Sequence, residues 1–192
     1  MSQPETERAQ VAALPADGVI GVLLEQHARL RDMFAAMQTA SGRERQALFD
    51  DLRELLALHE GGEEMVLRPV SRRSTGAGAD VADARNREEG EAAHMLADLE
   101  NLDVHSERFA ALFTEFEKAV SAHADLEEIE EFPAVQAALT AEELRDLGGK
   151  LLKVKGNALT QTDPAAAGSP TAQRVVGPFA ALLDKARDVF KD

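Results

Sequence analysis

The stretch His123–Glu128 (HADLEE), followed by Pro133, indicates the fold because a near-copy of it lies earlier in the chain. That copy is His59–Glu64 (HEGGEE), followed by Pro69, and it begins 64 residues upstream. In each copy a histidine is followed at positions +4 and +5 by two glutamates and at position +10 by a proline. Three coincidences at one offset indicate an internal repeat.

Each copy is expected to present one imidazole and one carboxylate on the same face of a helix. Residues four apart lie about one turn apart, so His59 and Glu63 can approach one point, as can His123 and Glu127. Apolar residues at helical spacing around both histidines place the two glutamates in buried stripes. A lone buried carboxylate costs several kcal/mol unless it is paired or binds a metal. The repeat therefore predicts a cation site.

The amino-acid composition excludes several classes of protein. The 192 residues include 35 acidic and 21 basic side chains, for a net charge of −14, which argues against non-specific binding to nucleic acid or an anionic membrane. There are no cysteines, so disulfides, thiolate ligands and cysteine nucleophiles are excluded. No apolar run approaches the roughly 18 residues of a membrane span, and no signal pattern opens the chain, so we expect a soluble, cytoplasmic protein.

The pattern along the chain predicts an all-α fold. Residues 1–16 have the composition of a flexible lead-in. Hydrophobic periodicity predicts four long helices, over about 17–39, 43–68, 80–102 and 107–137. Pro69 is expected to end the second helix and Pro133 to kink or shorten the fourth. Long helices with short connections predict an antiparallel four-helix bundle.

Further helices are expected after the bundle. Thr140–Glu143 fits a capping box for a fifth helix that would complete a domain over residues 17–155. Residues 156–176 have the composition of a flexible linker, and residues 177–192 predict an amphipathic C-terminal helix that must dock on another surface. Gly61 and Gly62, which cost about 2 kcal/mol together inside a helix, predict a close backbone approach or extra room beside the site.

Two further histidines extend the repeat. His27 lies in the apolar stripe of the first helix, and His94 lies near the middle of the third, whose expected core positions are Val81, Ala84, Met95, Leu99 and Leu102. The order is then His, His-x3-Glu, His, His-x3-Glu, so each half could give a metal two imidazoles while Glu63 and Glu127 bridge. Imidazole and carboxylate ligands without sulfur suit non-haem iron better than manganese or zinc. His105, the fifth histidine, is not expected to be a ligand.

Each feature also has a purely structural interpretation. A single His-x3-Glu pair on a helix surface adds a few tenths of a kcal/mol and needs no metal. A lone histidine in an apolar stripe is more often a hydrogen-bonded core residue than a ligand. A dinuclear site explains both copies and the two additional histidines together, which favours it over the structural interpretation.

This set of residues resembles the hemerythrin-like, HHE cation-binding domains over about residues 17–155. The resemblance implies an up-down four-helix bundle that holds two non-haem iron ions with an oxo or hydroxo bridge. It assigns His27 and His59 to one iron, His94 and His123 to the other, and Glu63 and Glu127 to both. Glu60 is an additional candidate, because some relatives recruit the glutamate that follows the second-helix histidine. Glu91, three residues before His94, is another.

The chain departs from the oxygen-carrying members of that family. Those members have two histidines four apart on the third helix, whereas Gly90 and Asp98 flank His94 at that spacing. They also use an aspartate at +5 in the last motif, where this chain has Glu127 at +4. We therefore expect a di-iron protein that reacts with dioxygen, hydrogen peroxide or nitric oxide, with catalase-like turnover. The alternative is a binding or sensing module without turnover. The sequence does not indicate an oligomeric state.

Overall fold

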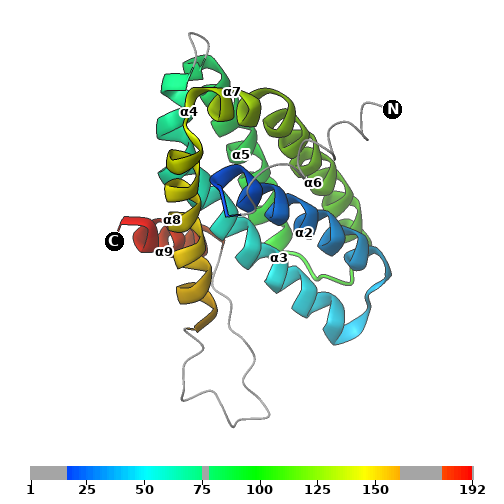
Figure 1. Cartoon of the computed structure of the whole chain (residues 1–192). Helices are drawn as coiled ribbons and strands as arrows, with labels where there is room; N and C mark the ends of the chain where they lie inside the picture. Colours follow the sequence, from blue (N-terminus) through cyan, green and yellow to red (C-terminus); the bar gives the residue numbers. More distant parts are fainter. Residues whose placement is uncertain (1–16, 75–77, 161–178, 192) are drawn as a thin grey trace, which may run out of the picture.

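Every regular element in the described part of the chain is a helix (Figure 1). The computed structural model describes residues 17–74, 78–160 and 179–191. The predicted lead-in, residues 1–16, and residues 161–176 of the predicted linker lie outside these ranges. The prediction that the linker begins at residue 156 is wrong, because residues 156–160 are helical. The all-α prediction is confirmed.

The four long helices predicted for the bundle are present, and two of them are interrupted by a π-helical segment. The elements are α2 (Val19–Thr39), α3 (Gly42–Gly62), η1 (Glu63–Leu67), α4 (Arg68–Ser74), α5 (Gly78–Glu100), α6 (Glu107–Leu126), η2 (Glu127–Glu131) and α7 (Phe132–Ala138). The run from α3 to α4 is continuous, as is the run from α6 to α7. Helices α2 and α3 pack together, and so do α5 and α6.

The prediction that Pro69 ends the second helix is wrong, because the helix continues to Ser74. In η1 the N–H of Arg68 donates to the carbonyl of Glu63, five residues back. In η2 the N–H of Phe132 donates to Glu127 in the same way. Proline has no N–H, and its ring crowds the carbonyl four residues back, so the wider turn that precedes each proline lets the helix continue. The repeat in the sequence is thus a repeated π-helical turn.

The bundle core has two apolar clusters with a polar layer between them. One cluster is rich in phenylalanine and includes the edge-to-face pair Phe49 and Phe109, whose ring centroids are 5.0 Å apart. The other includes Leu23, Val66 and Phe132. Glu63 and Glu127, the first residues of η1 and η2, lie along the chain between these clusters. The apolar side chains on either side keep water away from the two glutamates.

Two more helices pack on the bundle. Helix α8 (Ala141–Thr160) begins with the predicted capping box, in which the N–H of Thr140 donates to Glu143 Oε2 over 2.8 Å and the N–H of Glu143 donates to Thr140 Oγ1 over 3.3 Å. Helix α9 (Phe179–Lys191) packs on α3. A Cβ atom at Gly61 would lie 2.9 Å from Ala186 Cβ, so the expected close approach at this glycine is confirmed.

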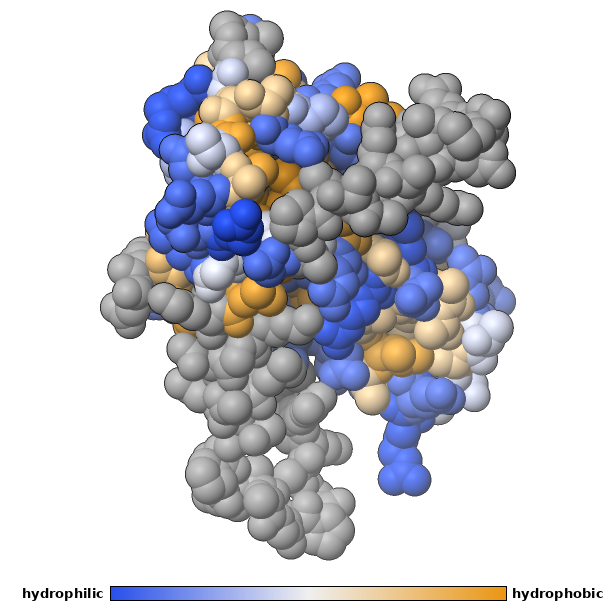
Figure 2. All heavy atoms as spheres, viewed as in Figure 1, coloured by the Kyte–Doolittle hydropathy of each residue, from blue (hydrophilic) through white to orange (hydrophobic). Residues whose placement is uncertain are grey.

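The visible surface is mixed in character. Hydrophilic side chains alternate with small hydrophobic patches over the described helices (Figure 2). None of the helices in the described ranges has both the length and the apolarity of a membrane span.

Candidate metal centre

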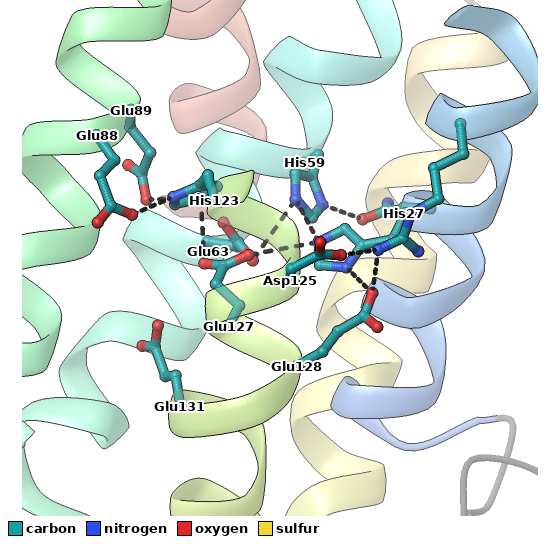
Figure 3. Close-up of polar contacts among 12 residues, drawn as sticks. His27, His59, Glu63, Glu88, Glu89, His123, Asp125, Glu127, Glu128 and Glu131 are labelled. Carbon is teal, nitrogen blue, oxygen red and sulfur yellow. Dashed lines mark hydrogen bonds and ion pairs between the residues drawn. The ribbon is translucent and has the colours of Figure 1, made fainter. Parts of the chain in front are cut away.

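Three histidines and two glutamates converge in the polar layer of the bundle (Figure 3). His27 comes from α2, His59 from the end of α3 and His123 from α6, while Glu63 and Glu127 are the first residues of η1 and η2. Their exposed fractions are at most 9%, and both glutamates are fully buried at 0%. The predicted burial of the two glutamates is confirmed. Each π-helical turn begins one helical turn after its histidine.

The outer nitrogen of each histidine is hydrogen-bonded to an oxygen, which fixes the tautomer. Nδ1 donates over 2.8 Å from His27 to Glu128, over 3.0 Å from His59 to Gln26, and over 3.0 Å from His123 to Glu88. Carboxylate and amide oxygens accept, so each Nδ1 carries the proton and each Nε2 of a neutral ring is left with its lone pair. The same outer hydrogen bonds orient histidines that bind metals.

The free Nε2 atoms point at one another and at the buried carboxylates. Those of His27 and His59 are 3.1 Å apart, and that of His27 is 3.3 Å from Glu127 Oε2. The Nε2 of His59 is 3.6 Å from Glu63 Oε1. Metal–imidazole bonds of about 2.0–2.1 Å at right angles would put two nitrogens about 3 Å apart. The His27–His59 pair therefore has the separation of two ligands of one ion.

The ionisable groups of this cluster divide into a charged pair, His123 and Glu127, and a neutral pair, His59 and Glu63. Despite burial, the close contact with Glu127 raises the pKa of His123 to about 9, and the neighbouring histidines hold the pKa of Glu127 well below its usual value. Burial and the neighbouring Glu127 raise the pKa of Glu63 well above its usual value. Burial and the adjacent His27 hold the pKa of His59 well below its usual value. Both shifts make the groups neutral, as expected when buried polar groups lack a counter-ion. A divalent cation bound beside Glu63 would lower the pKa of its carboxyl group again.

Two groups of four residues have the spacing of a metal site. The first position is formed by His27, His59, Glu63 and Glu127, and the second position by Glu63, Glu89, His123 and Glu127. Within each group one ligand atom per residue lies within 4.8 Å of the others. Glu63 and Glu127 belong to both groups. The arrangement therefore allows each of these carboxylates to bridge two ions.

The structure does not bring His94 to the cluster, contrary to the expectation from the sequence. Its side chain is exposed, and Glu89 is the residue of α5 that reaches the second position. Glu91 is also exposed, and so is His105, as expected. Glu60 is buried beside the cluster but belongs to neither group of four.

The misplacement of His94 comes from the phase of α5. The buried residues of this helix are Gly78, Ala82, Arg85, Ala92, Leu96 and Leu99. Glu89 lies four residues after Arg85 and three before Ala92, so it faces the same side. His94 is five residues further along, about 140° around the helix. Of the expected core positions, Val81, Ala84, Met95 and Leu102 are only partly buried, so the predicted phase was off by about one residue.

The sequence also gave no indication of Arg68, a buried guanidinium beside the second position. Its Nη2 is 2.9 Å from Glu127 Oε1 and 3.5 Å from Glu63 Oε2, and it forms further ion pairs with Glu89 and Glu131. Only 3% of Arg68 is exposed. It is thus one fixed positive charge among four carboxylates, three of which belong to the second position.

Several buried atoms that face the two positions have no hydrogen-bond partner in the described part of the chain. They are Glu63 Oε1, His123 Nε2 and Glu127 Oε2. Each of them lies near an opposite group without hydrogen-bond geometry: Glu127 Oε2 is 3.3 Å from His27 Nε2, Glu63 Oε1 is 3.6 Å from His59 Nε2, and His123 Nε2 is 3.3 Å from Glu127 Oε1. All three atoms are therefore available to a ligand. The two carboxylate oxygens have lone pairs, and His123 Nε2 has one once its ring loses a proton, so all three can bind a metal ion. The residues present therefore fit a metal.

A small cavity of about 20 Å³ opens onto both positions. Leu30, Leu56, Ala92 and Val120 form part of its wall, and His27, His59, His123, Glu60 and Glu89 border it mainly through their carbon atoms. That volume admits one water-sized molecule. Burial raises the pKa of Glu60 to about 8, so its carboxyl group holds a proton at neutral pH. The cavity can take a small oxygen or nitrogen species and excludes larger substrates.

Comparisons with known proteins agree with this geometry. Residues 18–135 match the sequence model of the hemerythrin HHE cation-binding domain, and this range contains every residue of both positions. An uncharacterised hemerythrin-like protein of Schizosaccharomyces pombe is 28% identical over 137 residues, which are 71% of this chain and 68% of that protein. The crystal structure of a hemerythrin HHE cation-binding domain-containing protein from Mycobacterium kansasii matches with a TM-score of 0.66 at 22% identity, over 88% of this chain and 98% of that one. At that identity the structural match shows a common fold.

Proposed function

Because this chain belongs to the hemerythrin HHE cation-binding domain family, we propose that it holds two iron ions, one at each position, and consumes hydrogen peroxide. The observation that carries the proposal is the convergence of three imidazole Nε2 atoms on two fully buried, shared carboxylates. His27 and His59 would hold the first ion, and Glu89 and His123 the second. Glu63 and Glu127 would serve both.

Charge supports two ions over one. Glu63, Glu89, Glu127 and Glu131 contribute four formal negative charges, and Arg68 supplies one positive charge. One divalent ion leaves a net negative charge in a buried layer, which is costly. Two divalent ions bring the layer to one positive charge, which one anionic oxygen ligand from solvent neutralises.

The choice of iron follows from the ligands. Imidazole ligands favour iron and the later transition metals, whereas carboxylate ligands favour harder ions. A site with both kinds of ligand and no cysteine suits iron. When bound, a pair of iron ions supplies reversible redox chemistry toward oxygen species. With four protein ligands at each position, six-coordinate ions keep places for small molecules.

The protein side chains explain why peroxide is the proposed substrate. The cavity touches residues of both positions, so a small oxygen species that enters it can approach both ions. Its apolar walls keep bulk water out, and Glu60 lies at the cavity wall, where its carboxyl group can exchange a proton with a departing oxygen. Two peroxide molecules would give one dioxygen and two waters, one peroxide being oxidised and the other reduced. No external reductant is required.

The test is an oxygen electrode trace of the iron-loaded protein after addition of peroxide. We expect dioxygen evolution that requires metal and is lost in Glu63→Ala. The matched control is Glu91→Ala, because Glu91 is an exposed glutamate on α5, and its activity should equal that of the wild type. A silent trace combined with a stable, reversible dioxygen adduct would contradict the proposal and indicate an oxygen carrier.

A second candidate, a sensing module, is favoured by the position of α9. This helix packs on α3 at Gly61 and Gly62, directly before the ligand Glu63, and Arg187 of α9 pairs with Glu64 over 2.6 Å. Movement of η1 on metal binding would thus reach α9. Limited proteolysis distinguishes the two candidates: a sensor releases α9 in response to metal or oxidant without evolving dioxygen, whereas an enzyme evolves dioxygen with α9 in place.

A further inference from the structure

The metal centre has no open path for a hydrated ion. The three histidines and two glutamates that converge there are at most 9% exposed. The cavity beside them has a volume of about 20 Å³, which is room for one water-sized molecule. A divalent ion in solution carries a shell of several water molecules and is larger than that. Metal ions can therefore enter or leave only when part of the protein moves.

Three sides of the centre are closed by contacts between the bundle helices themselves. Helix α2 packs on α3, and α5 packs on α6. Between α2 and the run from α6 to η2, Arg31 pairs with Asp125 and Glu128. Opening any of these sides would require the bundle itself to come apart.

The fourth side, between α3 and α5, is filled by α9. Helices α3 and α5 make little direct contact with each other, whereas α9 contacts both. Figure 3 shows α9 in pale red behind the site, between these two helices. Phe179 at its start packs in the phenylalanine-rich cluster, and Phe190 near its end packs against the other cluster. Helix α9 thus spans the polar layer from one apolar cluster to the other.

The cavity has residues from both edges of this fourth side. Glu60 of α3 and Glu89 of α5 border it. Gly61, the residue after Glu60, lies directly against α9, since a Cβ atom there would be 2.9 Å from Ala186 Cβ. Displacement of α9 would therefore uncover the flank of the bundle next to Glu60, whose carboxylate can receive an incoming cation.

Helix α9 is attached less firmly than the bundle helices are. Phe179 and Ala186 are buried, while its other apolar residues keep part of their surface exposed. The pair of Arg187 with Glu64 is 35% and 44% exposed, and an exposed ion pair adds little stability. The four bundle helices precede α9 in the chain, so its displacement breaks none of them. Such an element opens at a lower free energy than the whole fold.

We propose that α9 is the gate of the metal centre, and that metal ions enter and leave between α3 and α5, past Glu60, when α9 moves away from α3. This inference rests on the proposed metal centre and concerns the path of its ions. A gate changes the rates of uptake and release by the same factor and leaves the final metal content unchanged. A sensing module differs, because there the position of α9 and metal affinity are coupled.

The experiment ties α9 to α3 with a reversible disulfide in the full-length chain. The chain has no cysteine, so Gly61→Cys combined with Ala186→Cys introduces a single pair. A disulfide needs about 3.5–4.5 Å between Cβ atoms, so α9 has to shift by only about 1 Å. Uptake of Fe(II) by metal-free protein, without oxygen, is stopped with a chelator and read by elemental analysis. Release is read from the absorbance of an Fe(II)–chelator complex.

The oxidised double variant should take up and release iron more slowly than the wild type, by about tenfold or more. Both should reach the same final iron content, and reduction with a phosphine should restore fast exchange. Ala186→Cys alone, treated with the same oxidant, is the matched control and should behave as the wild type. Equal rates in the oxidised and reduced forms would overturn the inference, and so would a changed final content.

A second variant tests the gate if the disulfide does not form. Arg187→Ala removes the pair with Glu64 and should speed both uptake and release by about three- to fivefold, the factor that an exposed ion pair supplies. Arg72→Ala is the control, because Arg72 is an exposed arginine of α4 that pairs with Asp83 of α5. Its rates should equal those of the wild type. Unchanged rates in Arg187→Ala would contradict the gate.

The iron content separates this inference from the proposed function. If the wild type loads about two irons and the tether leaves the rates unchanged, the dinuclear centre stands and the gate fails. If one ion binds at a rate that the tether slows, the gate stands and the dinuclear centre fails. If no metal binds, both fail.

Discussion

His94 and His123 differ in burial, and this difference leads to opposite expectations for their variants. His123 is nearly buried and its Nε2 has no hydrogen-bond partner among the described residues, whereas His94 is exposed. We expect His123→Ala to lose at least one bound metal per chain and His94→Ala to keep the full content. Elemental analysis after reloading checks both, with the exposed His105→Ala as control. Metal loss in His94→Ala would show that α5 turns in solution to bring His94 inward.

Arg68 is expected to stabilise the metal-free protein strongly. Among the described residues it is the one cation that contacts Glu63, Glu89, Glu127 and Glu131 together, so Arg68→Met removes the guanidinium partner of all four carboxylates. Breaking a buried ion pair from one side costs about 3–5 kcal/mol, and we expect a loss of free energy of unfolding of that order in urea titrations.

A matched variant controls for the loss of Arg68. Arg31 also pairs with two carboxylates, Asp125 and Glu128, but it is exposed, so Arg31→Met should cost no more than about 1 kcal/mol. Metal should restore part of the stability lost in Arg68→Met. Equal losses in the two variants would contradict the assigned role of Arg68.

Among single residues, the sequence predicts the buried histidines and glutamates of the repeat, but it does not predict Glu89 or Arg68. His27, His59, Glu63, His123 and Glu127 share a signal because each lies in a clear apolar stripe. Helix α5 is rich in alanine and acidic residues, so the sequence marks its buried side weakly, and Glu89 was missed. The burial of Arg68 depends on carboxylates from three other elements, which no local pattern reveals.

Among the elements, α9 gives the sharpest prediction. A Cβ atom at Gly61 would lie 2.9 Å from Ala186 Cβ, so Gly61→Ala should push α9 away from α3. Gly90 is exposed on α5 and has no atom within 4 Å of such a Cβ, so Gly90→Ala should stabilise the protein by up to about 1 kcal/mol. Limited proteolysis and thermal unfolding should show faster cleavage near α9 and a lower Tm for Gly61→Ala alone. Two variants with the same response would refute this account of Gly61.

Helix positions were largely predictable, and helix continuity was not. Periodicity, the capping box at Thr140 and the start of the last helix near Pro178 agree with the structure to within a few residues. Proline normally ends a helix, and the sequence does not show that a π-helical turn would precede Pro69 and Pro133. That turn is stable here because Glu63 and Glu127 are held between two apolar clusters.

For the whole molecule, bound metal should raise stability. The folded chain brings the ligands of both positions together and the unfolded chain does not, so metal binding adds to the free energy of unfolding. With free metal at about one hundred times its dissociation constant, one ion adds about 2.7 kcal/mol. Calorimetry before and after chelation should show a clear fall in Tm. An unchanged Tm would mean that the buried glutamates do not need a cation.

The bundle as a whole could be predicted because four amphipathic helices with short connections have few ways to bury their apolar faces. The packing of α8 and α9 could not, because an amphipathic stripe shows that a helix docks without showing where. The glycine pair at Gly61 marked the place, but only the structure shows that α9 fills it.

The most direct test of the account is the number of metal ions that one chain binds. Metal-free protein, reloaded without oxygen with Fe(II) alone and desalted, should contain about two irons per chain by elemental analysis, because the two positions share Glu63 and Glu127 and their charges require two divalent ions. One iron per chain, or none, would contradict the dinuclear centre.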